Sequence, residues 1–243
     1  MQTFPYKAMI LAAGLGERMR PLTDHTPKPL LQVGGKALIL WQIERLRAAG
    51  FCDLVINVAH LGQQIEDFLG DGRAFDVRIA YSRESQPLET AGGIATARDL
   101  LGPHPFLVTN GDVYTNFDYA RLLPTLASMA TQPAQQAHLV LVDNPPHHPN
   151  GDFALADHRV IDQTQLDQTQ LTFSGIGCYQ PALFNGIAAG EKAKLAPLLK
   201  HAIRATAVTG EYFAGRWEDV GTAARLAALD VELQQALLSP QYP

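Results

Sequence analysis

The sequence predicts an α/β fold in which helices flank a central, mostly parallel β-sheet. Strand and helix patterns alternate regularly up to about residue 115, which is typical of βαβ units. Hydrophobic residues make up 47% and charged residues 18% of the 243 residues, so the chain can bury a substantial core. We find no repeat, linker-like segment or low-complexity tract, and therefore expect one domain.

The parallel strands are expected in the first half of the chain. Short apolar runs predict buried strands at 7–11, 53–60 and 105–112, and a further strand is expected at 77–82. Apolar residues at helical spacing predict helices at 37–50, 61–70 and 90–101, and glycines 50 and 70 end the first two. A loop is expected from residue 12 to about 35. The crossovers between these strands should be right-handed.

The second half has a looser pattern. It predicts a helix at 118–130, a strand at 138–143, a rigid proline-rich loop at 144–152 and several short strands between 152 and 180. A helix is expected at 195–203, an edge strand at 206–214 and a final amphipathic helix at 222–237.

Composition limits the partners and the compartment. The net charge is -5 and no basic stripe is present, so we do not expect nucleic acid as a partner. Cys52 and Cys178 lie far apart in apolar surroundings, which indicates two reduced, packed thiols. Residues 1–20 lack a signal-peptide layout, and no apolar run approaches the roughly 18 residues of a membrane span. We therefore expect a soluble cytoplasmic protein with no membrane partner.

The stretch LAAGLGERMRPLTDHTPKPL at 11–30 follows the first strand. A glycine-bearing loop after a first parallel strand is where α/β proteins hold phosphates on backbone N–H groups. A dinucleotide fingerprint would need glycine at Met19, and a Walker A loop would need Gly-Lys in place of Met19 and Arg20. Arg18, Arg20 and Lys28 instead indicate a ligand with several negative charges. Three prolines stiffen the loop that presents Lys28.

Several motifs together resemble the sugar-1-phosphate nucleotidyltransferases. They are GLGERMRPLT with TPKPL, then ETAGG at 89–93, NGD at 110–112 and WEDVGT at 217–222. The short chain, with no left-handed β-helix repeat, is most similar to the compact N-acetylmuramate-1-phosphate uridylyltransferases of bacterial cell-wall recycling. The resemblance implies a Rossmann-like, mostly parallel central sheet of the nucleotide-diphospho-sugar transferase type. It also implies a nucleotide-binding part at about 1–115 and a smaller β-rich, sugar-binding part at about 116–220.

The activity implied by the resemblance joins UTP to N-acetylmuramate 1-phosphate, giving UDP-N-acetylmuramate and pyrophosphate. A phosphate has a second pKa of about 6, so the attacking oxygen is already ionised and no general base is required. Cations and positioning must do the rest. Alternatives are a mannose-1-phosphate or glucose-1-phosphate nucleotidyltransferase, or a non-catalytic nucleotide-sugar sensor on the same fold.

The resemblance assigns roles to individual residues. Lys28, Arg18 and Asp112 are the expected catalytic residues, and Asp112 and Asp219 the expected Mg²⁺ ligands, because magnesium prefers one or two carboxylates with phosphate oxygens. The nucleotide is expected to contact Leu11, Ala12, Ala13, Gly14, Gly16, Arg18, Lys28, Thr90, Ala91 and Gly92. The sugar is expected to contact Asn110, Gly151, Asp152, Ser174 and Gly175.

Simpler interpretations exist for most of these residues. Lys28 alone would be read as a solvated loop lysine, Asp112 as a turn residue and Asp219 as the start of a helix. Adjacent His147 and His148 point apart in most backbones, so we do not expect them to bind a metal together.

One departure from the family concerns the sugar phosphate. Larger members carry a Glu-Lys-Pro triplet whose lysine holds it, whereas this chain has Asp162-Gln163-Thr164 near that point. Lys28, the metal or Lys194 must then hold that phosphate.

Overall fold

A single nine-stranded sheet runs through both halves of the chain. The computed structural model describes residues 5–162 and 169–238, so Gln163 and Thr164 lie outside the described residues. The strand order is β5 (Arg78–Arg83), β4 (Asp53–Val58), β1 (Ala8–Leu11), β6 (Phe106–Asn110), β11 (Thr172–Tyr179), β8 (Ala137–Val142), β12 (Val208–Tyr212), β10 (Arg159–Asp162) and β9 (Phe153–Ala156).

The sheet is mostly parallel, as predicted. Strands β5, β4, β1 and β6 pair in parallel, and β8 pairs in parallel with β12. Only β11 and β10 run against the direction of the other strands. Strands β4, β1 and β6 are mostly apolar and buried because helices cover both faces of the sheet, whereas β5 is a partly exposed edge strand.

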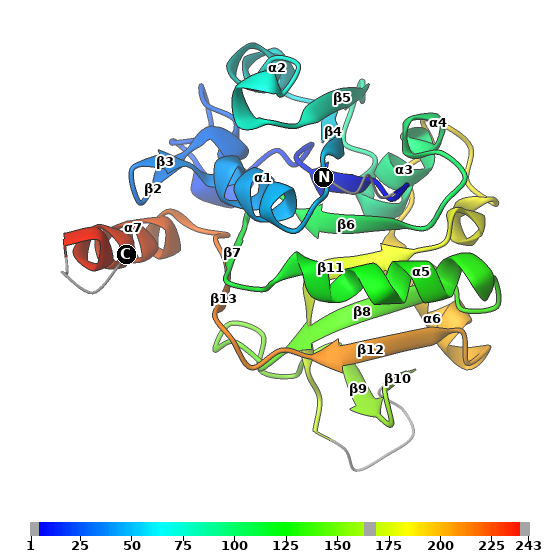
Figure 1. The fold of residues 1–243 in the computed structure, drawn as a ribbon. Coiled ribbons are helices and arrows are strands. Elements are labelled where there is room, and N and C mark those ends of the chain that lie inside the picture. The colour runs from blue at the N-terminus through cyan, green and yellow to red at the C-terminus, as the bar shows by residue number, and fades with distance from the viewer. Residues whose placement is uncertain (1–4, 163–168, 239–243) are drawn as a thin grey trace.

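Two helical layers sandwich the sheet (Figure 1). Helices α1 (Leu38–Ala48), α2 (Gly62–Leu69) and α5 (Leu123–Thr131) share one apolar cluster with alternate strand residues such as Ala8 and Ile10. Helices α3 (Glu89–Thr96), α4 (Arg98–Leu101) and α6 (Leu195–Arg204) share the other with Met9 and Val55. No helix in the described part of the chain has the length and apolar character to cross a lipid bilayer.

The predicted edge position of strand 206–214 is wrong. Strand β12 lies between β8 and β10, and the β9–β10 hairpin forms the outer edge instead. A Cβ on Gly210 would stand 2.8 Å from Cγ2 of Val160, so the absence of a side chain lets the hairpin pack closely there. The pairing of β12 with β10 joins segments that are distant in sequence, so the residues of 206–214 alone did not indicate that this strand has a neighbour on both sides.

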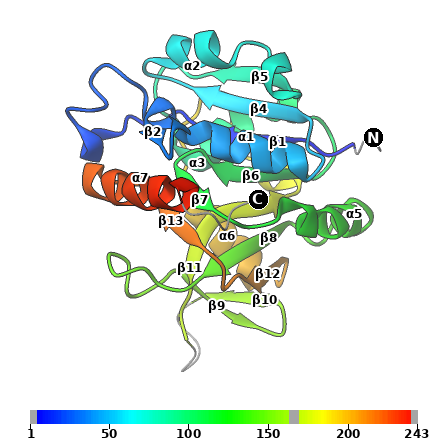
Figure 2. The ribbon, with the colours of Figure 1, turned by 60° about the vertical axis from the view of Figure 1, so that its left-hand side comes forward.

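The C-terminal helix α7 (Ala223–Leu238) forms a third cluster with the long loop after β1 (Figure 2). That loop contains 3-10 helices η1 (Glu17–Met19) and η2 (Lys28–Leu30) and the hairpin β2 (Gln32–Val33) and β3 (Lys36–Ala37). Leu226, Leu229 and Leu233 of α7 share this cluster with Met19 and Val33. The Gly34 N–H also donates to Asp230 Oδ1 at 2.8 Å. The last helix therefore fixes the loop that carries Arg18 and Lys28.

Candidate active site

A cavity of about 710 Å³ opens where β1 and β6 end. The loop after β1 forms one wall, and residues 87–90 at the start of α3 form another. Asn110 and Asp112 lie at the end of β6, and Gly221 contributes from the segment before α7. The carboxyl ends of parallel strands are where α/β proteins bind ligands. The cavity therefore lies where the sequence predicted it.

A small ribbon outside the main sheet brings Asp112 and Asp219 together. Strands β7 (Val113–Thr115) and β13 (Trp217–Asp219) pair antiparallel, with Val113 opposite Asp219. The Val220 N–H donates to the Asp112 carbonyl at 3.0 Å and extends the ladder by one step. These strands have three residues each, too few to show a period in the sequence. The two carboxylates predicted to share a metal, those of Asp112 and Asp219, thus lie on neighbouring segments of the ribbon.

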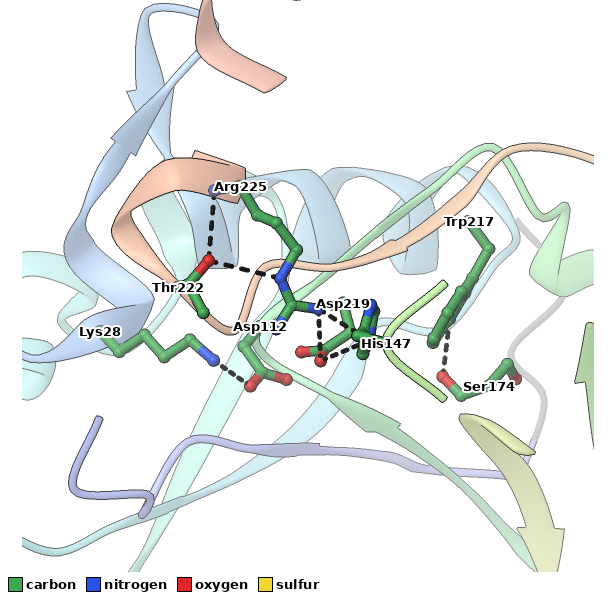
Figure 3. Close-up of polar contacts among 8 residues, drawn as sticks. All are labelled: Lys28, Asp112, His147, Ser174, Trp217, Asp219, Thr222 and Arg225. Atoms are coloured by element: carbon green, nitrogen blue, oxygen red, sulfur yellow. Dashed lines mark hydrogen bonds and ion pairs between the residues drawn. The ribbon is translucent and has the colours of Figure 1, made fainter. Parts of the chain in front are cut away.

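Each of these carboxylates contacts a cation (Figure 3). Lys28 Nζ donates to Asp112 Oδ2, and the Lys28 side chain is 10% exposed. Arg225 Nη1 lies 3.0 Å from Asp219 Oδ2 and 2.8 Å from His147 Nε2. Burial and the nearby Arg225 guanidinium lower the pKa of His147, so its neutral ring can accept that hydrogen bond. Arg225 was not among the predicted residues.

The residues present suit a divalent cation that also has phosphate ligands. The described residues contain no group of three or more His, Cys, Asp or Glu side chains able to hold a metal. Asp112 and Asp219 alone would leave most coordination positions to phosphate oxygens and water. Mg²⁺ commonly binds in this way, through one or two carboxylates and its substrate.

A buried network supports the other side of the cavity. Asn57 Oδ1 accepts from the Ala12 N–H at 2.8 Å, and Asn57 Nδ2 donates to Glu84 Oε1 at 2.7 Å. Glu84 Oε2 accepts from the Leu88 N–H at 3.0 Å, and burial raises the pKa of Glu84. The network thereby ties the glycine loop to the segment before α3. Asn57 and Glu84 were missed, although their places near the ends of β4 and β5 were a usable signal.

Two N–H groups in the first turn of α3 are covered by a loop, whereas residues 87–90 before them line the cavity. The N–H groups of Ala91 and Gly92 both donate to the Ala193 carbonyl, at 3.0 and 3.1 Å. A Cβ on Gly92 would collide with the carbonyl of Glu191, so only glycine allows this approach. The same loop puts Lys192 in the cavity wall, whereas Lys194 does not line it.

Of the residues expected to contact the sugar, Asn110 lines the cavity and the others lie outside its lining. Asn110 lines the cavity and its amide packs against Gly175, where a Cβ would lie 2.5 Å from Asn110 Nδ2. Ser174 is buried and its hydroxyl donates to the Val140 carbonyl at 2.7 Å. Asp152 Oδ2 accepts from the Phe173 N–H at 2.9 Å.

Gly151 precedes this aspartate with φ +60°, where a side chain would be strained. His148 Nε2 lies 3.1 Å from the other Asp152 oxygen. His147 contacts Arg225 and His148 contacts Asp152, so the two adjacent histidines have different partners.

The predicted site residues divide into two groups. Those lining the cavity are Leu11, Ala12, Ala13, Gly14, Gly16, Arg18, Lys28, Thr90, Asn110 and Asp112. Those outside its lining are Ala91, Gly92, Gly151, Asp152, Ser174, Gly175 and Asp219.

Comparisons with known proteins show the family of this chain. A family model described as nucleotidyl transferase matches residues 7–236. The N-acetylmuramate alpha-1-phosphate uridylyltransferase of Neisseria meningitidis serogroup B is 56% identical over 221 residues, covering 90% of this chain and 95% of that protein. The mannose-1-phosphate guanyltransferase of Schizosaccharomyces pombe is 43% identical over 119 residues, which are 48% of this chain and 33% of that protein.

The fold also matches solved structures. A Bacillus anthracis protein described as a glucose-1-phosphate thymidylyltransferase superimposes with a TM-score of 0.82 at 20% identity, covering 94% of this chain and 95% of that one. This likeness concerns the fold alone and confirms the expected architecture. With the family model and the full-length relative, it leads to one conclusion: the chain belongs to the nucleotidyl transferase family, as its motifs indicated.

Proposed function

We propose that the protein transfers a uridylyl group from UTP to N-acetylmuramate 1-phosphate, forming UDP-N-acetylmuramate and pyrophosphate. The observation that carries this proposal is the contact of Lys28 with Asp112 at the cavity, with Asp219 on the strand that pairs beside Asp112. The sugar and the base follow from the 56% identical relative, whose name specifies that uridylyltransferase activity.

The chemistry balances without a protein nucleophile. An ionised oxygen of the sugar phosphate attacks the α-phosphorus of UTP. A new P–O bond forms while the bond to the β-phosphate oxygen breaks, and pyrophosphate leaves with that electron pair. Lys28 reduces the repulsion between the two phosphate groups and stabilises the charge that develops during attack. Its burial against Asp112 keeps the ammonium aimed at the reacting centre.

Asp112 and Asp219 would hold a divalent cation, which we propose to be Mg²⁺. When bound, the ion neutralises phosphate charge and orients the phosphate oxygens for in-line attack. Lys28 and Arg225 neutralise the same two carboxylates when no ion is there, so the pair does not repel itself.

The two substrates would use different walls. The backbone of residues 11–14 and of 87–90, tied together through Asn57 and Glu84, would read the uracil base. Ala91 and Gly92 would support this wall rather than touch the nucleotide, since their N–H groups are bonded to Ala193.

The sugar would lie on the β11 side, against Asn110. Gly175 would hold that amide in place, and Gly151, Asp152 and Ser174 would shape the β11 backbone behind it.

A lysine of the loop before α6 completes the sugar side. Lys192 lines the cavity and has no carboxylate partner among the described residues. We infer that Lys192, rather than Lys194, contacts the phosphate of the sugar.

The two cysteines are unpaired, which supports the cytoplasm as the compartment.

A pyrophosphate-release assay tests the function. UTP and Mg²⁺ are incubated with the protein and a panel of sugar 1-phosphates, and the product is identified by mass spectrometry. We expect release with N-acetylmuramate 1-phosphate. Release only with mannose or glucose 1-phosphate would refute the assigned sugar, release only with another nucleotide would refute UTP, and no release with any sugar would favour a sensor.

A further inference from the structure

Two guanidinium groups meet across Gly221, at the edge of the cavity. Arg225 Nη2 lies 2.6 Å, and Arg18 Nη2 3.1 Å, from the point where a Cβ on Gly221 would stand. The two nitrogens are therefore no further apart than the sum of those distances. Asp219 Oδ2 is 3.0 Å from the same point. A side chain at position 221 would separate these groups, so glycine allows them to converge.

The packing of α7 holds the two arginines in this arrangement. Arg18 precedes Met19, and Arg225 precedes Leu226; Met19 and Leu226 are buried in the same apolar cluster. Thr222 Oγ1 accepts from the Arg225 N–H at 3.3 Å and caps the first turn of the helix. The backbone next to each arginine is thus anchored in the core, although Arg18 itself is exposed.

The described residues do not balance the charges at this point. Arg225 Nη1 contacts His147 and Asp219, but its Nη2 has no hydrogen-bond partner among the described residues. The Arg18 side chain likewise has no ion pair or hydrogen bond there. Two guanidinium groups and one carboxylate, that of Asp219, converge around Gly221. Like charges held this close call for an anion with several oxygens between them.

We infer that Arg225 acts with Arg18 as a second guanidinium of the pyrophosphate subsite. It binds the β- and γ-phosphates of the nucleotide and then the departing pyrophosphate, whose charge increases as the bond to the α-phosphate breaks. This inference rests on the proposed function. It adds a residue that makes contact with the leaving group, from the end of the chain opposite to the glycine loop.

Binding of inorganic pyrophosphate tests the role of Arg225 directly. Calorimetry with saturating Mg²⁺ compares the full-length protein with Arg225→Gln, Arg225→Lys and, as a matched control, Arg204→Gln, an exposed arginine of α6 outside the cavity. We expect at least tenfold weaker binding for Arg225→Gln, partial recovery for Arg225→Lys and no change for Arg204→Gln. The KM for the sugar 1-phosphate should stay within twofold in Arg225→Gln.

Gly221→Ala is a second variant that keeps both arginines but pushes them apart, and it should weaken pyrophosphate binding in the same direction. Thermal unfolding of each variant checks that the fold persists. Unchanged pyrophosphate affinity in folded Arg225→Gln would refute the inference. So would a loss that is present at limiting Mg²⁺ and absent at saturating Mg²⁺, because Arg225 would then act only through Asp219.

The proposed function is tested independently of the Arg225 variants. It fails if the wild-type protein makes no UDP-sugar, whatever the variants bind.

Discussion

Replacing Lys28 by methionine should slow turnover by about two to three orders of magnitude while the protein stays folded. Methionine preserves most of the apolar stem and removes the ammonium that contacts Asp112. The Lys28 side chain is 10% exposed and that of Asp112 is 31% exposed, so the orphaned carboxylate can be partly hydrated. A hydrogen bond between charged groups is worth about 1.5–3 kcal/mol, and we expect a loss of about 2 kcal/mol in unfolding free energy.

This loss is small beside the roughly 5–15 kcal/mol that stabilises a domain. It corresponds to a fall of about 4–8 °C in Tm for a chain of this length. Pyrophosphate release at 25 °C and thermal unfolding separate the two effects. Lys36→Met is a matched control, because Lys36 pairs with Glu44 outside the cavity. A rate loss below tenfold in Lys28→Met, or an equal loss in the control, would refute the role of Lys28.

Three further predictions address other parts of the site. Asp219→Asn should raise the Mg²⁺ concentration for half-maximal turnover at least tenfold, and an unchanged metal titration would contradict metal binding there. Burial raises the pKa of Glu84 in the folded state. Wild-type stability should therefore fall as pH rises from about 4.5 through that raised pKa, more steeply than in Glu84→Gln; urea unfolding from pH 4 to 7 with parallel profiles would contradict this. Lys192→Gln should raise the KM for the sugar 1-phosphate about tenfold and Lys194→Gln should not, and equal effects in steady-state kinetics would show that position in the cavity does not matter.

The first half of the fold was predictable because its signals are local. Strands β1, β4 and β6 are short, mostly apolar runs, and each is followed closely by small or polar residues that begin a loop. Lys28 and Asp112 could be selected for the same reason: one lies in a proline-stiffened loop and the other follows a buried strand. The rule about strand ends favoured this edge of the sheet, and the resemblance to the family selected these two residues there.

The parts that could not be predicted depend on contacts between distant segments. The β7–β13 pairing joins residues about a hundred positions apart through strands too short to show alternation. Arg225 looks like an ordinary polar position of an amphipathic helix. Only the apolar cluster that Leu226 shares with Met19 brings Arg225 near Arg18. The inner position of β12 likewise depends on a hairpin that the local sequence does not indicate.

The β7–β13 ribbon has a consequence for how such a protein can diversify. The chain leaves this ribbon after Thr115 and returns to it at Trp217. Most of the residues proposed to surround the sugar therefore lie in the one long segment between these two strands. Insertions or exchanged loops inside that segment would alter which sugar 1-phosphate fits, while the spacing of Asp112 and Asp219 would stay the same. New acceptors can then be sampled without rebuilding the ion-binding centre.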